Sequence, residues 1–136
     1  MKIVADSYAW IEVFSGTRKG DSAKRRMEEA DTVITPDTVL AEIARKYVRE
    51  GIDEDVTRQR LSVIEEASEP AYIDDEVAIG AAGAYLHLVK KAKDEGLEKP
   101  SLFDALVLAI ARKNDGKVLT GDEHFKNLQE TMWMGT

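Results

Sequence analysis

Short apolar runs separated by longer helical patterns constrain the fold of this chain more than any other feature. Four runs have the length of strands, at 2–5 (KIVA), 32–35 (TVIT), 70–73 (PAYI) and 117–119 (KVL). A fifth, at the sheet edge, is expected over 131–134. Because parallel neighbours need crossover connections and helices lie between these strands, the order predicts a mainly parallel sheet. We therefore expect one α/β domain over residues 1–136, with a mainly parallel central sheet of four to five short strands.

Helical spacing of apolar residues, together with capping residues, predicts six helices between these strands. Pro36 suits a first helical turn and Gly51 suits the position after a last turn. Asp74 and Ser101 are typical N-caps. The segment 16–20 is expected to separate the first two helices. The expected helices cover about 7–15, 21–30, 37–50, 53–67, 75–95 and 102–114, and a short helical turn follows in TGDEHF (120–125).

Composition excludes several classes of site. The chain has no cysteine, which rules out disulfides, cysteine-ligated zinc, iron–sulfur clusters and a cysteine nucleophile. A net charge of −7 argues against strong nonspecific binding to nucleic acid, but it allows a nucleic-acid substrate held through metal ions. No run approaches the roughly 20 apolar residues of a membrane span, and an aspartate at position 6 is unlike a secretory signal. We expect a cytoplasmic protein with no membrane partner.

Three aspartates are expected at one edge of the sheet. Asp6 directly follows the first strand, and Asp122 lies three residues after the last residue of the fourth. Asp104 is near the start of the helix that leads into the fourth strand, so it lies at the same edge. Ligands of parallel α/β sheets bind at that carboxyl edge. Each aspartate alone has an ordinary alternative: Asp6 as an N-cap, Asp104 in a capping box with Ser101, and Asp122 in a turn. Their coincidence favours a site.

Helical periodicity treats Glu42 differently. The helix over 37–50 has its apolar stripe on one side, and Glu42 falls roughly opposite that stripe. Periodicity therefore predicts a solvated surface glutamate, and nothing in the local pattern separates Glu42 from Glu50 or Glu54.

Clustered carboxylates repel one another and stay ionised only when a cation is present. An all-oxygen donor set suits Mg²⁺ or Mn²⁺, as one or two ions. Such ions activate water and stabilise the leaving oxygen of a phosphodiester. The chain has no glycine-rich nucleotide-binding loop of either common type, and its two histidines do not allow a Ser-His-Asp set to be assigned. A binding module without catalysis, and a metal-dependent phosphatase or receiver domain, remain alternatives.

Three stretches in order resemble the PIN-domain family, in particular the VapC-type toxin nucleases: IVADSYAWIEVF, ITPDTVLAEIARKYVREG and PSLFDALVLAIARKNDGKVLTGDEHF. The resemblance implies a three-layer α/β/α fold and a metal-dependent ribonuclease. It assigns the catalytic and metal-binding acids to four positions, called the four acids below: Asp6, Glu42, Asp104 and Asp122. It gives supporting roles to Ser7, next to the first acid, and to Thr120, which would orient the site by hydrogen bonding.

The same resemblance implies an RNA substrate, a cognate antitoxin protein and a homodimer. A nuclease of RNA processing or quality control, and a silent relative that only binds RNA or protein, are its alternatives. Arg45, Lys46 and Arg49 are candidates for RNA-phosphate contacts, although solvated helix faces and cations favoured at a helix C-terminus are the more ordinary explanation. His124 is interpreted as a turn-stabilising residue rather than a substrate contact.

Overall fold

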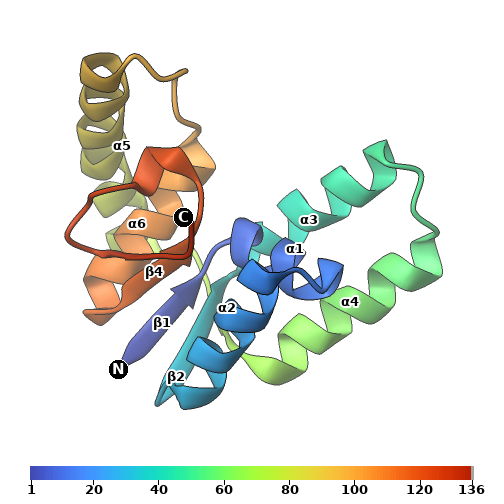
Figure 1. Ribbon diagram of the computed structural model, residues 1–136. Coiled ribbons are helices and arrows are strands. Elements are labelled where there is room, and N and C mark those ends of the chain that lie inside the picture. The colour runs from blue at the N-terminus through green and yellow to red at the C-terminus, as the bar shows by residue number, and fades with distance from the viewer. Residues whose placement is uncertain (136) are drawn as a thin grey trace.

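A computed structural model describes residues 1–135. Within that part of the chain, five strands form one sheet in the order β3-β2-β1-β4-β5, and every neighbouring pair is parallel (Figure 1). The expected α/β fold with a parallel sheet is confirmed. The strands are β1 (Lys2–Ala5), β2 (Thr32–Pro36), β3 (Glu69–Ala71), β4 (Lys117–Thr120) and β5 (Thr131–Trp133).

Six α-helices and one 3₁₀ turn, η1, connect the strands in the described residues. They are α1 (Ser7–Ser15), α2 (Arg18–Glu29), α3 (Asp37–Arg49), α4 (Glu54–Ala67), α5 (Asp75–Glu95), α6 (Leu102–Asn114) and η1 (Glu123–Phe125). None of the helices in residues 1–135 combines the length and the apolar character that crossing a bilayer requires.

The two faces of the sheet pack against different helices, because alternate residues of a strand point to opposite faces. Ile3 and Leu119 belong to a small cluster with Ala23 of α2. Val4 and Val118 belong to the larger cluster, which includes residues of α3, α4, α5 and α6. The sheet therefore lies between two helical layers, as the three-layer arrangement requires.

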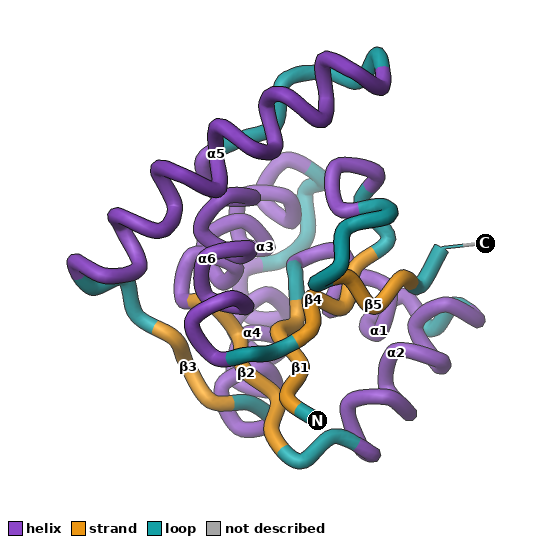
Figure 2. Tube along the Cα trace, turned by 90° about the vertical axis from the view of Figure 1, so that its left-hand side faces the viewer, coloured by secondary structure: helices purple, strands orange, loops and turns teal. Residues whose placement is uncertain are grey.

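The apolar run after Asp104 is explained by the position of α6. All residues from Ala105 to Ala111 are buried, because α6 lies between the sheet and α5. Helix α5 crosses the outside of α6 at the periphery of the molecule, where the tube view shows no further element on its outer side (Figure 2).

Two boundaries differ from the sequence prediction by more than one residue. Helix α2 begins at Arg18, three residues earlier than expected, because Thr17 caps it and Gly20 lies inside it. A Cβ at Gly20 would come within 2.0 Å of the Glu12 carbonyl oxygen, so this glycine allows α1 and α2 to approach closely and does not break a helix. Strand β3 ends at Ala71, and the following Tyr72 is exposed.

Candidate functional site

Asp6 and Thr120 meet at the carboxyl edge of the two neighbouring strands β1 and β4. The Thr120 hydroxyl donates a hydrogen bond to Asp6 Oδ2 at 2.8 Å, and the Ser7 backbone N–H donates to Asp6 Oδ1 at 2.8 Å. Asp6 is only 3% exposed and is also the N-cap of α1. The N-cap interpretation of Asp6 is therefore confirmed, and its membership of a functional site stays a prediction. Ser7 supports Asp6 through its backbone.

Asp122 is joined to Asp6 through the same hydroxyl. The Asp122 backbone N–H donates to Thr120 Oγ1 at 3.0 Å, so Thr120 bridges the two acidic residues. Gly121 lies between Thr120 and Asp122 in the chain, with its Cα against the ring of Tyr8, since a Cβ there would come within 2.4 Å of that ring. The hydrogen bonds that the resemblance implies for Thr120 are therefore present, and its role in orienting a site stays a prediction.

Asp104 enters the edge from the first turn of α6. Its side chain accepts from the Ser101 N–H at 3.0 Å, and its own N–H donates to Ser101 Oγ at 3.2 Å, which completes a capping box. Burial raises the pKa of Asp104, and the nearby charge of Asp122 raises it further. The side chain is thus a helix cap and a member of the acidic cluster at once.

Glu42 corrects the expectation from periodicity. It is half-buried, and its Oε1 is buried without a hydrogen-bond partner among residues 1–135. Burial, then the charges of Asp6 and Asp104, raises the pKa of Glu42 to about 8. The side of α3 opposite its apolar stripe faces the acidic edge here instead of open solvent. A surface glutamate would have no reason for such a change in pKa.

The four acids therefore influence one another electrostatically. Burial raises the pKa of Asp6 to about 7, against the lowering effect of the Thr120 hydrogen bond, and the charges of Asp104 and Asp122 add to the rise. Buried carboxylates that repel one another require protons or a cation. Hard oxygen donors with an unpartnered buried oxygen fit a divalent ion such as Mg²⁺ or Mn²⁺.

Comparison with known sequences identifies the family of this chain. The sequence profile of the PIN domain matches residues 3–130. The chain belongs to the PIN domain family. This confirms the resemblance found in the sequence. A comparison with curated proteins found no match.

Solved structures share the fold of this PIN domain along nearly the whole chain. A toxin–antitoxin complex from Klebsiella pneumoniae superposes with a TM-score of 0.67 at 20% identity, covering 97% of each chain. VapBC2 from Rickettsia felis, bound to a DNA fragment from its promoter, gives 0.69 at 16% identity, covering 98% of this chain and 97% of the other. The sarcin-ricin loop cleaving toxin VapC20 of Mycobacterium tuberculosis gives 0.66 at 18% identity, with 88% and 89% covered. At these identities the likeness concerns the fold.

His124 lies beside Asp122 and Asp104, a position that the sequence alone does not predict. Its Nδ1 lies 3.0 Å from Asp122 Oδ1 and its Nε2 lies 2.7 Å from the Glu98 carbonyl oxygen. Both contacts fit the expected turn-stabilising role. Burial lowers the pKa of His124, but the hydrogen bonds to Glu98 and Asp122 outweigh it and the pKa is raised. One donor atom each from Asp104, Asp122 and His124 lie within 4.8 Å of one another, close enough to share an ion. In the sequence, the spacing of two residues between Asp122 and His124 is the feature that points to this position.

The basic residues of α3 divide into two groups in this PIN domain. The charge of Arg45 lowers the pKa of Glu42. The Arg45 guanidinium is therefore close enough to act on the four acids. Lys46 is engaged with Glu50 on the same helix at 3.4 Å, and Arg49 is exposed near the helix end. Lys19, which the sequence did not single out, lies 3.3 Å from the Tyr8 hydroxyl, beside the 120–122 loop.

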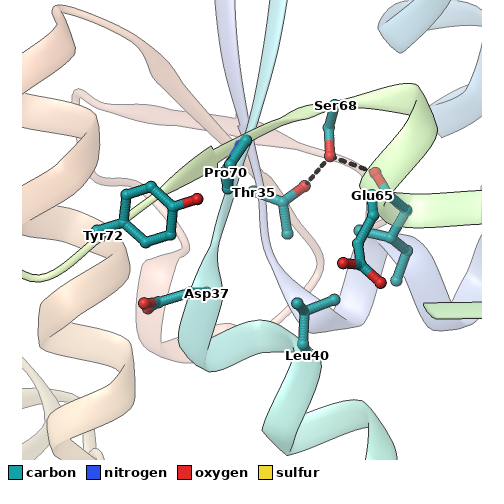
Figure 3. Close-up of a pocket in the computed structure, with 8 residues that line it drawn as sticks. Thr35, Asp37, Leu40, Glu65, Ser68, Pro70 and Tyr72 are labelled. Atoms are coloured by element: carbon teal, nitrogen blue, oxygen red, sulfur yellow. Dashed lines mark hydrogen bonds between the residues drawn. The ribbon is translucent and has the colours of Figure 1, made fainter. Parts of the chain in front are cut away.

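A separate pocket of about 210 Å³ opens beside the start of α3, and none of the four acids lines it. Figure 3 shows a hydrogen bond between the hydroxyls of Thr35 and Ser68, with Asp37 and Glu65 to either side of it. The two hydroxyl oxygens lie 2.8 Å apart. Trp10 Nε1 donates to Thr35 Oγ1 at 3.1 Å. This hydrogen-bond chain ties α1, β2 and α4 together, so the hydroxyls of Thr35 and Ser68 are already satisfied by the fold.

Proposed function

We propose that this chain is a Mg²⁺- or Mn²⁺-dependent endoribonuclease and the toxin of a VapBC-type toxin–antitoxin pair. The observation that carries the proposal is the buried, unpartnered Oε1 of Glu42, which faces carboxylates from three other parts of the chain. A buried oxygen without a hydrogen-bond partner lowers the stability of the fold unless a cation or a proton binds to it.

The ions would be held by the four acids, Asp6, Glu42, Asp104 and Asp122. When bound, they would supply activation of a water for attack on phosphorus and stabilisation of the departing oxygen. The Thr120 hydroxyl would keep Asp6 Oδ2 in a fixed direction and the loop to Asp122 in place. The Ser101 capping box would hold Asp104 at the N-terminus of α6, a helix end that also favours the negative charge of phosphate.

RNA is the proposed substrate, and Arg45 is the first candidate for a phosphate contact because its charge reaches Glu42. Lys46 and Arg49 would extend that contact along α3. We place the activity in the cytoplasm, where RNA substrates and Mg²⁺ occur together.

An antitoxin partner is proposed because the PIN domains with similar folds include toxin–antitoxin complexes. The acidic edge, in a chain with net charge −7, suits a basic antitoxin segment whose arginine would enter among the carboxylates. Co-expression with the product of the neighbouring gene should give a stable complex with reduced RNA cleavage. Absence of both a complex and inhibition would contradict this partner.

The decisive experiment is cleavage of a defined set of RNAs with Mg²⁺, with Mn²⁺ and with EDTA, beside the Asp104→Asn protein. We expect cleavage with either ion, none with EDTA and none by the variant. Cleavage that persists in EDTA or in Asp104→Asn would contradict the metal-dependent assignment. RNA binding without cleavage under all conditions would indicate the silent relative instead.

A further inference from the structure

The imidazole ring of His124 is held between two fixed groups. Its Nε2 lies 2.7 Å from the Glu98 carbonyl oxygen, and its Nδ1 lies 3.0 Å from Asp122 Oδ1. Glu98 belongs to the segment between α5 and α6, so the ring connects that segment to the acidic edge. The side chain is only 20% exposed, and its position is therefore set by the surrounding chain.

The Glu98 carbonyl decides which ring nitrogen carries a hydrogen. A carbonyl oxygen only accepts hydrogen bonds, so Nε2 is the donor in this contact. In a neutral imidazole the other nitrogen, Nδ1, then has a lone pair and no hydrogen. That nitrogen faces Asp122 Oδ1, which is also an acceptor. Two acceptors 3.0 Å apart repel each other unless a cation, either a proton or a metal ion, binds to both.

Metal-binding histidines have this same arrangement of partners. One ring nitrogen binds the ion, and the other donates its hydrogen to a backbone carbonyl or a carboxylate, which fixes the orientation of the ring. The Glu98 carbonyl occupies the second of these places here. One donor atom each from Asp104, Asp122 and His124 lie within 4.8 Å of one another, so a single ion can reach all three side chains.

The turn at η1 does not require the imidazole. Its cap is the backbone N–H of His124, which donates to Asp122 Oδ1 at 2.9 Å, and any residue except proline supplies that N–H. The fully buried Phe125 anchors the turn in the larger apolar cluster. The turn-stabilising interpretation therefore explains the backbone of His124 and the contact at Nε2, but it does not explain why Nδ1 faces the acids.

We propose that His124 is a nitrogen ligand of the divalent ion at the acidic edge, and that it makes this chain prefer transition-metal ions over Mg²⁺. The inference rests on the metal dependence proposed above and adds one residue to the four acids. Mg²⁺ is a hard ion that is bound through oxygen. Imidazole is a softer ligand, and affinity for sites that contain it rises from Mn²⁺ to Co²⁺ along the transition series.

Calorimetric titration of the full chain with Mg²⁺, Mn²⁺ and Co²⁺ tests this preference. His124→Gln should lower the affinity for Co²⁺ at least about 10-fold more than the affinity for Mg²⁺, with Mn²⁺ between them. A histidine that only positions Asp122 would lower all three affinities by the same factor, and that result overturns the proposal.

The chain offers a matched control in its other histidine. His87 is exposed on α5, and its Nδ1 lies 3.0 Å from a guanidinium nitrogen of Arg112, so it faces a cation instead of acids. His87→Gln should therefore bind all three ions like the unaltered protein. An equal change in metal preference for His87→Gln and His124→Gln overturns the assignment to His124.

Pulsed electron spin resonance of bound Mn²⁺ tests ligation directly, because a nitrogen bound to the ion modulates the spin echo. The unaltered protein and His87→Gln should show this nitrogen modulation, and His124→Gln should not. His124→Asn is a second variant, and circular dichroism verifies the folding of each. Modulation that is absent from the unaltered protein, or that persists in a folded His124 variant, overturns the proposal.

Neither measurement involves RNA, so failure of this inference can be distinguished from failure of the proposed function. Binding of Mn²⁺ to the unaltered protein without nitrogen modulation overturns the role of His124 alone and leaves the four acids as the ligands. No binding of any of the three ions overturns both this inference and the metal-dependent nuclease.

Discussion

Carboxylates at the sheet edge and carboxylates on the α5 surface have opposite electrostatic environments. On α5, a hydrogen bond from Lys113 lowers the pKa of Asp74, and one from Lys90 lowers that of Asp94. At the edge, burial raises the pKa of Asp6 to about 7 and that of Glu42 to about 8. The ionised form of the surface acids is stabilised by these lysines. The edge acids lower the stability of the folded chain until a proton or a cation reaches them, which is characteristic of functional sites.

Removing one acid from each region should give the largest contrast. Asp6→Asn should lower RNA cleavage by at least about 100-fold, because an amide is a poor ligand for a hard cation and even supporting residues of metal sites are worth 10–100-fold. Asp94→Asn on α5 is the matched control and should cleave RNA at the unaltered rate. Rates with Mg²⁺ or Mn²⁺ are the measurement, with circular dichroism to verify folding. Equal activity of the two variants would remove the functional distinction between the regions.

The pH dependence of the metal-free protein should reveal the same contrast. In the folded state the pKa of Asp6 is raised from 3.8 to about 7, and that of Glu42 from 4.5 to about 8. Between the ordinary and the raised pKa of each group, the folded state therefore binds more protons than the unfolded state. Stability contributed by these protons is present below about pH 4 and is lost as pH rises to about 8. A tenfold difference in proton affinity between the folded and unfolded states is worth about 1.4 kcal/mol. The Tm of the metal-free protein should therefore fall by several degrees as the pH rises through this range.

Calorimetric scans between pH 4.5 and pH 8.5, with and without Mn²⁺, measure this effect. Mn²⁺ should restore Tm at the upper end of the range, and Glu42→Gln should flatten the slope without metal. A Tm that rises with pH in the metal-free protein would show that the edge acids are solvated like those of α5.

Thr120→Val should have an intermediate effect. It removes the hydroxyl that bridges Asp6 and the backbone of Asp122 while keeping the shape of the side chain. We expect Mn²⁺ affinity to fall by about 10-fold, as for other residues that orient metal ligands. Thr120→Ser keeps the hydroxyl and should bind normally. Calorimetric titration with Mn²⁺ separates the two variants, and equal affinities would mean that the hydroxyl does not orient the site.

The smallest effect should come from the surface. Lys90→Gln removes the partner of Asp94, and it should leave Tm nearly unchanged, since exposed ion pairs contribute little and are screened by salt. Thermal unfolding at low and high salt checks this. A large loss of Tm would place the α5 acids in the same energetic class as the edge.

The sequence sufficed for features that depend on local order. Strand, helix and cap patterns predicted that Asp6, Asp104 and Asp122 would meet, because a parallel sheet puts strand ends and helix starts on one side. Glu42 could not be found in this way. A helical wheel identifies the side that faces the helix's own core, but it cannot say that another part of the chain covers the opposite side.

Close contacts between elements were equally invisible in the sequence. The sequence predicts a break that includes Gly20, because a glycine that allows two helices to touch looks the same in sequence as one that ends a helix. The exposed apolar residues of α5, Ile79 and Leu86, cannot be separated from its buried ones in the sequence for a related reason. Apolar residues occur all around that helix, so periodicity alone does not distinguish the face on α6 from the exposed one.

The bond between Asp6 and Thr120 joins residues 114 positions apart. A ribosome making this protein therefore releases the first acid from its exit tunnel long before the last ones exist. The acidic edge assembles only once β4 has docked beside β1, so an unfinished chain carries scattered carboxylates and no assembled edge. Under the proposed function, partial products would be inactive, and a partner would need to inhibit only completed copies.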